Sequence, residues 1–102
     1  LPDVALANGL DPSGIAHDPL TVKAYLDDPL VHDRISARLA KAVIDAGESA
    51  RAAAAKWDTA TLLLYGGADR IVDPAGSAAF AAGAPGAVVE AQRFDALYHE
   101  IF

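Results

Sequence analysis

The sequence has no cysteine and no methionine among its 102 residues. The lack of cysteine excludes a disulfide framework, a thiolate zinc site and a cysteine nucleophile. Positive charge is also scarce, because 8 Lys and Arg side chains stand against 14 Asp and Glu, which gives a formal charge of −6. No basic cluster is present that could follow a phosphate backbone, so we do not expect nucleic acid as a partner.

Long apolar runs are missing too. The strongest ones, Ala60–Tyr65 and Ala78–Ala82, fall far short of the roughly 18 to 20 residues that a membrane-spanning helix needs. We therefore expect no transmembrane segment. Residues 1–10 have no basic region followed by an apolar one, so no signal peptide is visible, and we expect a cytoplasmic protein.

Large apolar side chains are fewer than the composition suggests. The apolar fraction is 53%, but 24 of these residues are alanine. A chain of this length is one domain or less, and a small core stabilises it poorly. We expect the chain to be unable to fold alone.

Proline and glycine divide the first part of the chain. Four prolines and two glycines interrupt residues 1–29, which leaves room only for short helices, and Leu20–Leu26 is the best candidate. His17 lies in this interrupted part and is expected to be exposed. Tyr25, like Tyr98 and Trp57, is expected to be a packing anchor.

A longer helix follows. Apolar residues recur at steps of three and four from Ile35 to Trp57, which predicts an amphipathic helix over about Arg34–Lys56. Asp33 is the expected N-cap, with His32 packed beside the helix start. Gly47 inside this helix predicts a bend or a close backbone contact.

The last part of the chain predicts a strand, a helix and a second strand. Thr61–Tyr65 is a continuous apolar run before two glycines, typical of a strand buried on both faces of a parallel sheet. A helix over Ala75–Ala82 and a weaker strand over Ala87–Phe94 complete one right-handed crossover unit. The fold class is therefore α/β, and because two strands do not make a stable sheet, its other strands must lie elsewhere.

Two loops leave the carboxyl ends of these strands, where open parallel sheets build their sites. The first loop carries Asp69 and Asp73, and the second carries His99. Asp73 precedes Pro74 at a predicted helix start and is expected to cap that helix. Asp69 is then the carboxylate free to orient His99 as an imidazole base.

Three stretches resemble the monoacylglycerol lipase and lysophospholipase branch of the α/β-hydrolases, of the serine aminopeptidase S33 type. They are Asp28–Arg38, Leu62–Pro74 and Tyr98–Glu100, and the match covers nearly the whole chain in order. The resemblance implies the C-terminal half of such an enzyme. Residues 1–57 would form a helical cap segment, and residues 58–102 the last βαβ unit of a mostly parallel sheet.

The resemblance also implies a Ser-Asp-His triad with Asp69 as the acid and His99 as the base. The family's nucleophile lies in a Gly-x-Ser-x-Gly elbow before the cap, and no such motif occurs in these 102 residues. The serine would therefore belong to a missing N-terminal half, and this chain alone is expected to be inactive. The implied substrate is a monoacylglycerol, a lysophospholipid or a short ester, with no metal or organic cofactor.

Two other interpretations remain open from the sequence. An aspartate in the elbow would give a dehalogenase or an epoxide hydrolase with the same acid and base. Alternatively, the chain is a non-catalytic acidic binding module. His99→Ala in the complete protein separates this last case from the enzymes, because it would leave a binding function unchanged.

Overall fold

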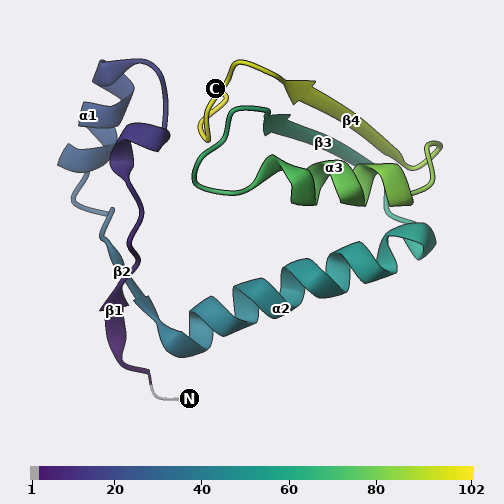
Figure 1. Cartoon of the computed structure of the whole chain (residues 1–102), viewed down its shortest axis with the longest axis horizontal. Coiled ribbons are helices and arrows are strands. Elements are labelled where there is room, and N and C mark those ends of the chain that lie inside the picture. Colours follow the sequence, from purple (N-terminus) through teal and green to yellow (C-terminus); the bar gives the residue numbers. More distant parts are fainter. Residues whose placement is uncertain (1–2) are drawn as a thin grey trace.

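The computed structural model describes residues 3–102 and contains two small sheets joined by one long helix (Figure 1). The N-terminal part holds β1 (Ala5–Ala7), a 3₁₀ turn (Pro12–Gly14), α1 (Pro19–Asp27) and β2 (Arg34–Ser36). The long helix α2 (Ala37–Ala53) ends in a second 3₁₀ turn (Ala54–Lys56). The C-terminal part holds β3 (Thr61–Gly66), α3 (Pro74–Gly83) and β4 (Val89–Phe94).

The predicted crossover unit is confirmed. Strands β3 and β4 pair in parallel, from Thr61 opposite Val89 to Gly66 opposite Phe94. Helix α3 connects them and packs along the strand pair. Because both strands run in the same direction, their carboxyl ends lie together, and Figure 1 shows both arrowheads pointing toward the part of the chain that holds α1.

Helix α3 begins as its sequence predicts. The Asp73 carboxylate accepts a hydrogen bond from the Ala75 amide at 2.9 Å, and Pro74 occupies the first helical position. The Phe80 ring of α3 meets the Trp57 ring edge to face, with the centroids 5.1 Å apart. The Trp57 indole also donates to the Thr61 hydroxyl at 2.9 Å, which joins the end of α2 to the start of β3.

Helix α2 starts later than its sequence predicts, and the expected cap at Asp33 is wrong. The Ser36 hydroxyl caps α2 by accepting from the Leu39 amide at 3.1 Å. Residues 34–36 instead form β2, which pairs antiparallel with β1. Serine caps a helix as well as aspartate does, so strand pairing decides where the helix begins.

Gly47 lies within the continuous helix α2 and has no close backbone neighbour. A Cβ placed on Gly47 would meet no heavy atom within 4 Å. The expected short helix near residue 20 is confirmed as α1, in which Asp18 accepts from the Leu20 amide at 2.9 Å and Pro19 follows at the first position.

Few side chains are buried in the described part of the chain. The buried apolar residues there are Ile15, Ala54 and Val89. The radius of gyration is 15.5 Å, against about 13 Å for a compact domain of this length. The predicted apolar stripe on α2 is largely uncovered, because Leu39 and Val43 are more than half exposed. Among residues 3–102, no helix is long and apolar enough to cross a bilayer.

Candidate active site

The candidate site lies where the loops after β3 and β4 cross. Two hydrogen bonds join the loops: the Gly67 amide donates to the Phe94 carbonyl at 2.8 Å, and the Ala68 amide donates to the Leu97 carbonyl at 3.0 Å. A Cβ on Gly66 would overlap the Tyr98 carbonyl and would lie 2.6 Å from the Leu97 carbonyl oxygen. Only glycine leaves room for this crossing of two backbones.

This crossing brings Asp69 and His99 into contact. The His99 Nδ1 atom lies 2.9 Å from Asp69 Oδ2. The other carboxylate oxygen of Asp69 accepts from the Ile71 amide at 2.8 Å and from the Val72 amide at 3.0 Å. The Asp69 side chain is 11% exposed and the His99 side chain 39%, so the carboxylate is sheltered while the imidazole remains accessible.

The surroundings of Asp69 keep it ionised at neutral pH. Burial acts to raise the pKa of Asp69, but hydrogen bonds from the Val72 amide, the His99 ring and the Ile71 amide outweigh burial and lower that pKa below its usual value. An ionised carboxylate only accepts hydrogen bonds, so Nδ1 of His99 carries the shared proton. The Nε2 atom then presents its lone pair and can act as a base.

An open, largely apolar cavity of about 570 Å³ adjoins this pair. Asp69 and His99 both line it, together with aliphatic and aromatic side chains that include Ile15, Tyr25 and Leu64. Such a surface suits an apolar ligand, and the His99 ring lies at its wall.

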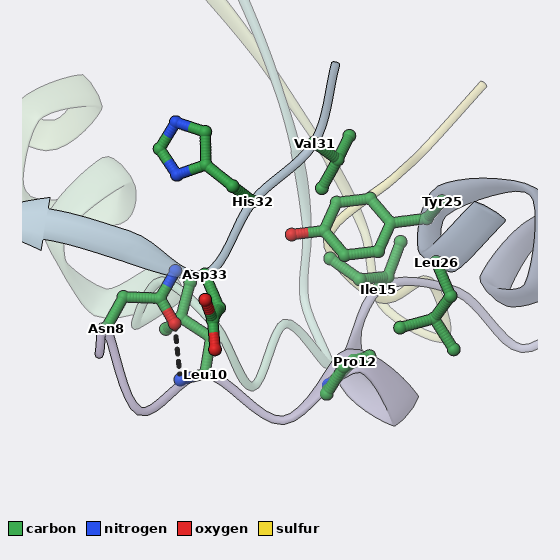
Figure 2. Close-up of a pocket in the computed structure, with 9 residues that line it drawn as sticks. All are labelled: Asn8, Leu10, Pro12, Ile15, Tyr25, Leu26, Val31, His32 and Asp33. Atoms are coloured by element: carbon green, nitrogen blue, oxygen red, sulfur yellow. Dashed lines mark hydrogen bonds between the residues drawn. The ribbon is translucent and has the colours of Figure 1, made fainter. Parts of the chain in front are cut away.

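A second cavity of about 470 Å³ lies next to the first. The two cavities share Leu10, Ile15 and Tyr25 in their linings. Figure 2 shows the Tyr25 ring reaching into the second cavity from α1. His32 and Asp33 add polar groups to its lining, so the second cavity is more polar than the one beside His99.

The remaining sequence candidates lie apart from the acid–base pair. Asp73 caps α3, as expected. His32 accepts a hydrogen bond from the Arg34 amide at 3.2 Å through Nδ1 and lies on the second cavity. Among residues 3–102, no group of three or more His, Cys, Asp and Glu side chains is arranged to hold a metal ion.

Sequence reasoning missed contacts of His17 and Arg70 with the loop that carries His99. His17 is exposed, as expected, but its ring stacks on the Tyr98 ring with centroids 3.7 Å apart. The Arg70 guanidinium lies 4.6 Å from the centroid of the Tyr98 ring. No local sequence signal points to the His17 contact, because its hydrogen-bonding partner Ala96 lies 79 residues away along the chain.

Comparison with known proteins places this arrangement in context. The family model described as "Serine aminopeptidase, S33" matches residues 1–102. A monoacylglycerol lipase of Mycolicibacterium smegmatis is 33% identical over 102 residues, which cover 99% of this chain and 36% of that protein. An uncharacterized abhydrolase domain-containing protein of Dictyostelium discoideum is 31% identical over 102 residues, which are 99% of this chain and 11% of that protein.

The crystal structure of a monoacylglycerol lipase from Paleococcus ferrophilus has a similar fold. It superposes with a TM-score of 0.91 at 41% sequence identity, covering 97% of this chain and 38% of that lipase. The chain therefore spans little more than a third of the length of the two lipases.

Proposed function

Because this chain belongs to the serine aminopeptidase S33 family and has the fold of the C-terminal part of an α/β-hydrolase, we propose that it supplies the acid and the base of a carboxylic ester hydrolase. The acid is Asp69 and the base is His99. The observation that carries the proposal is the contact of 2.9 Å between Asp69 Oδ2 and His99 Nδ1 at the carboxyl ends of two adjacent parallel strands.

In this proposal each group has one role. His99 Nε2 takes the proton of a serine hydroxyl as the serine oxygen attacks the ester carbonyl. When the tetrahedral intermediate collapses, His99 gives that proton to the departing alkoxide, and the alcohol leaves an acyl-enzyme. Water then attacks the acyl-enzyme with His99 again as base. Asp69 fixes the ring tautomer and stabilises the imidazolium.

The nucleophilic serine belongs to the part of the protein outside these 102 residues. No Gly-x-Ser-x-Gly elbow occurs in the sequence. The other strands of the sheet belong there too, because β3 and β4 form a sheet of only two strands in this part of the protein. Residues 1–57 act as a cap and residues 58–102 as part of the hydrolase core.

The cavities and the relatives support the proposed substrate class. Two similar proteins are monoacylglycerol lipases. The apolar cavity beside His99 suits an acyl chain, so the substrate is a monoacylglycerol, a lysophospholipid or a shorter ester. An aspartate nucleophile acting on halides or epoxides is not favoured, because both of these similar proteins are named as lipases, which are ester hydrolases.

Ester hydrolysis by the full-length protein tests the proposal. We expect His99→Ala to lower kcat for a monoacylglycerol by about three orders of magnitude or more. Asp69→Asn should lower kcat by roughly 10³- to 10⁴-fold, because an amide no longer fixes the ring tautomer.

Asp73→Asn is the matched control, since Asp73 is the other carboxylate of the same loop and caps α3. It should leave kcat within about twofold of wild type and stability nearly unchanged, because asparagine caps a helix about as well as aspartate. Full esterase activity in His99→Ala would contradict the proposal, because His99 would then not be the base.

A further inference from the structure

The segment Ser13–His17, here called the bridging segment, is fastened to both loops of the candidate site. The Glu100 amide donates to the Ile15 carbonyl at 2.8 Å. The Ala96 carbonyl lies 2.6 Å from Nε2 of His17. The base at position 99 therefore lies between two backbone positions that are held by the same segment.

The third fastening comes from the loop that carries the acid. The Arg70 guanidinium donates to the Ser13 carbonyl at 3.2 Å. A Cβ on Gly14 would lie 3.2 Å from Cδ1 of Ile71, so the bridging segment and this loop are in close contact. Residues on either side of His99, and the two residues that follow Asp69, thus contact the same segment.

His17 makes two contacts with the loop that carries His99. A carbonyl oxygen can only accept a hydrogen bond, so His17 Nε2 carries a proton and donates a hydrogen bond to the Ala96 carbonyl. The same imidazole stacks on the Tyr98 ring at 3.7 Å with an angle of 26° between the ring planes. Both contacts fall on the three residues immediately before His99.

We propose that His17 is a positioning residue for the acid–base pair. It holds Ala96 and Tyr98 so that the His99 ring keeps Nδ1 on Asp69 and Nε2 toward the cavity. This role rests on the proposed function. His17 does not line the cavity beside His99, so it acts through the loop and not on the substrate.

The position of the His99 ring depends on this support. The His99 side chain is 39% exposed, so packing around the ring holds it incompletely, and its place depends on the backbone of its own loop. A misplacement of about 1 Å at a reacting group can cost roughly 100-fold in rate. A loop released from His17 would sample such displacements.

Kinetics of the full-length protein test the inference. We expect His17→Ala to lower kcat by about tenfold to 100-fold while KM changes by less than about threefold, because substrate contacts are intact. His17→Gln, whose amide can donate to the Ala96 carbonyl, should restore part of kcat. Asp18→Ala is the matched control: it removes the α1 cap next to His17 and should leave kcat within about twofold.

A second readout does not depend on turnover. The proton between His99 Nδ1 and Asp69 should give a far-downfield ¹H NMR resonance in the wild type and in Asp18→Ala. We expect this resonance to weaken or vanish in His17→Ala at a temperature where all three proteins are folded.

Two results would overturn the inference. One is a His17→Ala variant with wild-type kcat and an intact downfield resonance. The other is an equal fall of kcat in His17→Ala and Asp18→Ala with equal losses of thermal stability, which would make His17 merely structural. Failure of the proposed function is recognised separately, because His99→Ala would then keep its activity while the resonance still reports on His17.

Discussion

Asp69 accepts hydrogen bonds through both carboxylate oxygens, from His99 and from the Ile71 and Val72 amides. Burial acts to raise its pKa, and these bonds reverse that effect, so the pKa in the folded protein lies below the usual value of 3.8. A carboxyl group with a lowered folded pKa stabilises the fold at every pH above its unfolded pKa. This stabilisation is lost as the pH falls through the folded pKa.

The ionisation of Asp69 predicts a pH dependence of stability. In the full-length protein, the free energy of unfolding of wild type relative to Asp69→Asn should fall as the pH is lowered below about 4. Urea unfolding of both proteins at several pH values measures this difference. A difference that stays constant down to about pH 3 would show that the carboxylate does not ionise as described.

Sequence reasoning found Asp69 and His99 because the topology brings them together. Neighbouring parallel strands end at one edge, so an acid after β3 and an imidazole after β4 are close whatever the rest of the protein does. It did not find the contacts of His17, because exposed histidines carry no pattern that names a partner 79 residues away.

Helix α2 begins at a residue that the apolar periodicity does not single out. Ser36 is both the last residue of β2 and the cap of α2, with its hydroxyl accepting from the Leu39 amide. Position 35, the first residue of the predicted apolar stripe, lies instead in a strand, opposite Leu6. The helix predicted from the local pattern thus begins about three residues before the true helix start at Ala37.

The cap of α2 gives a matched pair of variants. We expect Ser36→Ala to lower the free energy of unfolding of the full-length protein by about 1 kcal/mol, because one amide of the first turn loses its partner. Asp33→Ala should change it by less than about 0.5 kcal/mol, since Asp33 does not cap the helix. Chemical denaturation measures both, and the reverse order of effects would restore Asp33 as the cap.

Elements with local signals were predictable, and elements that depend on distant pairing were not. The strand β3 follows from its own apolar run, and α3 follows from Asp73 and Pro74 at its start. Strand β1 is only Ala5–Ala7, which has no alternation of apolar and polar residues. It becomes a strand because β2 lies beside it, and that pairing spans about 30 residues of chain.

The arrangement of the described chain is broad and thin, with principal extents of 41 × 37 × 19 Å. Large apolar side chains remain exposed on several elements, among them Leu6, Leu30, Val43, Ile44 and Leu62. Strand β3 also has only one hydrogen-bonded neighbour within residues 3–102. We therefore expect the stability of this region to depend on surfaces beyond these residues.

The exposed apolar side chains of this region predict how the 102-residue chain behaves when it is produced alone. We expect no cooperative thermal transition, because the three buried apolar residues within residues 3–102 do not offset the entropy of ordering the chain. We also expect no esterase activity, because the chain has no Gly-x-Ser-x-Gly elbow. Calorimetry measures the thermal transition, and sedimentation shows whether the chain is a monomer. A sharp transition from a monomer would contradict it, whereas recovery of structure on adding the remaining part of the protein would agree with it.

The crossing of two backbones at Gly66 bears on how this region tolerates sequence variation. A side chain that meets a larger neighbour can change rotamer, but the main-chain carbonyl of Tyr98 has no rotamer to change. When every codon is randomised and active clones are selected, position 66 should accept as few replacements as position 99. Gly66, which has no side-chain functional group, would then tolerate replacement as poorly as the proposed base His99.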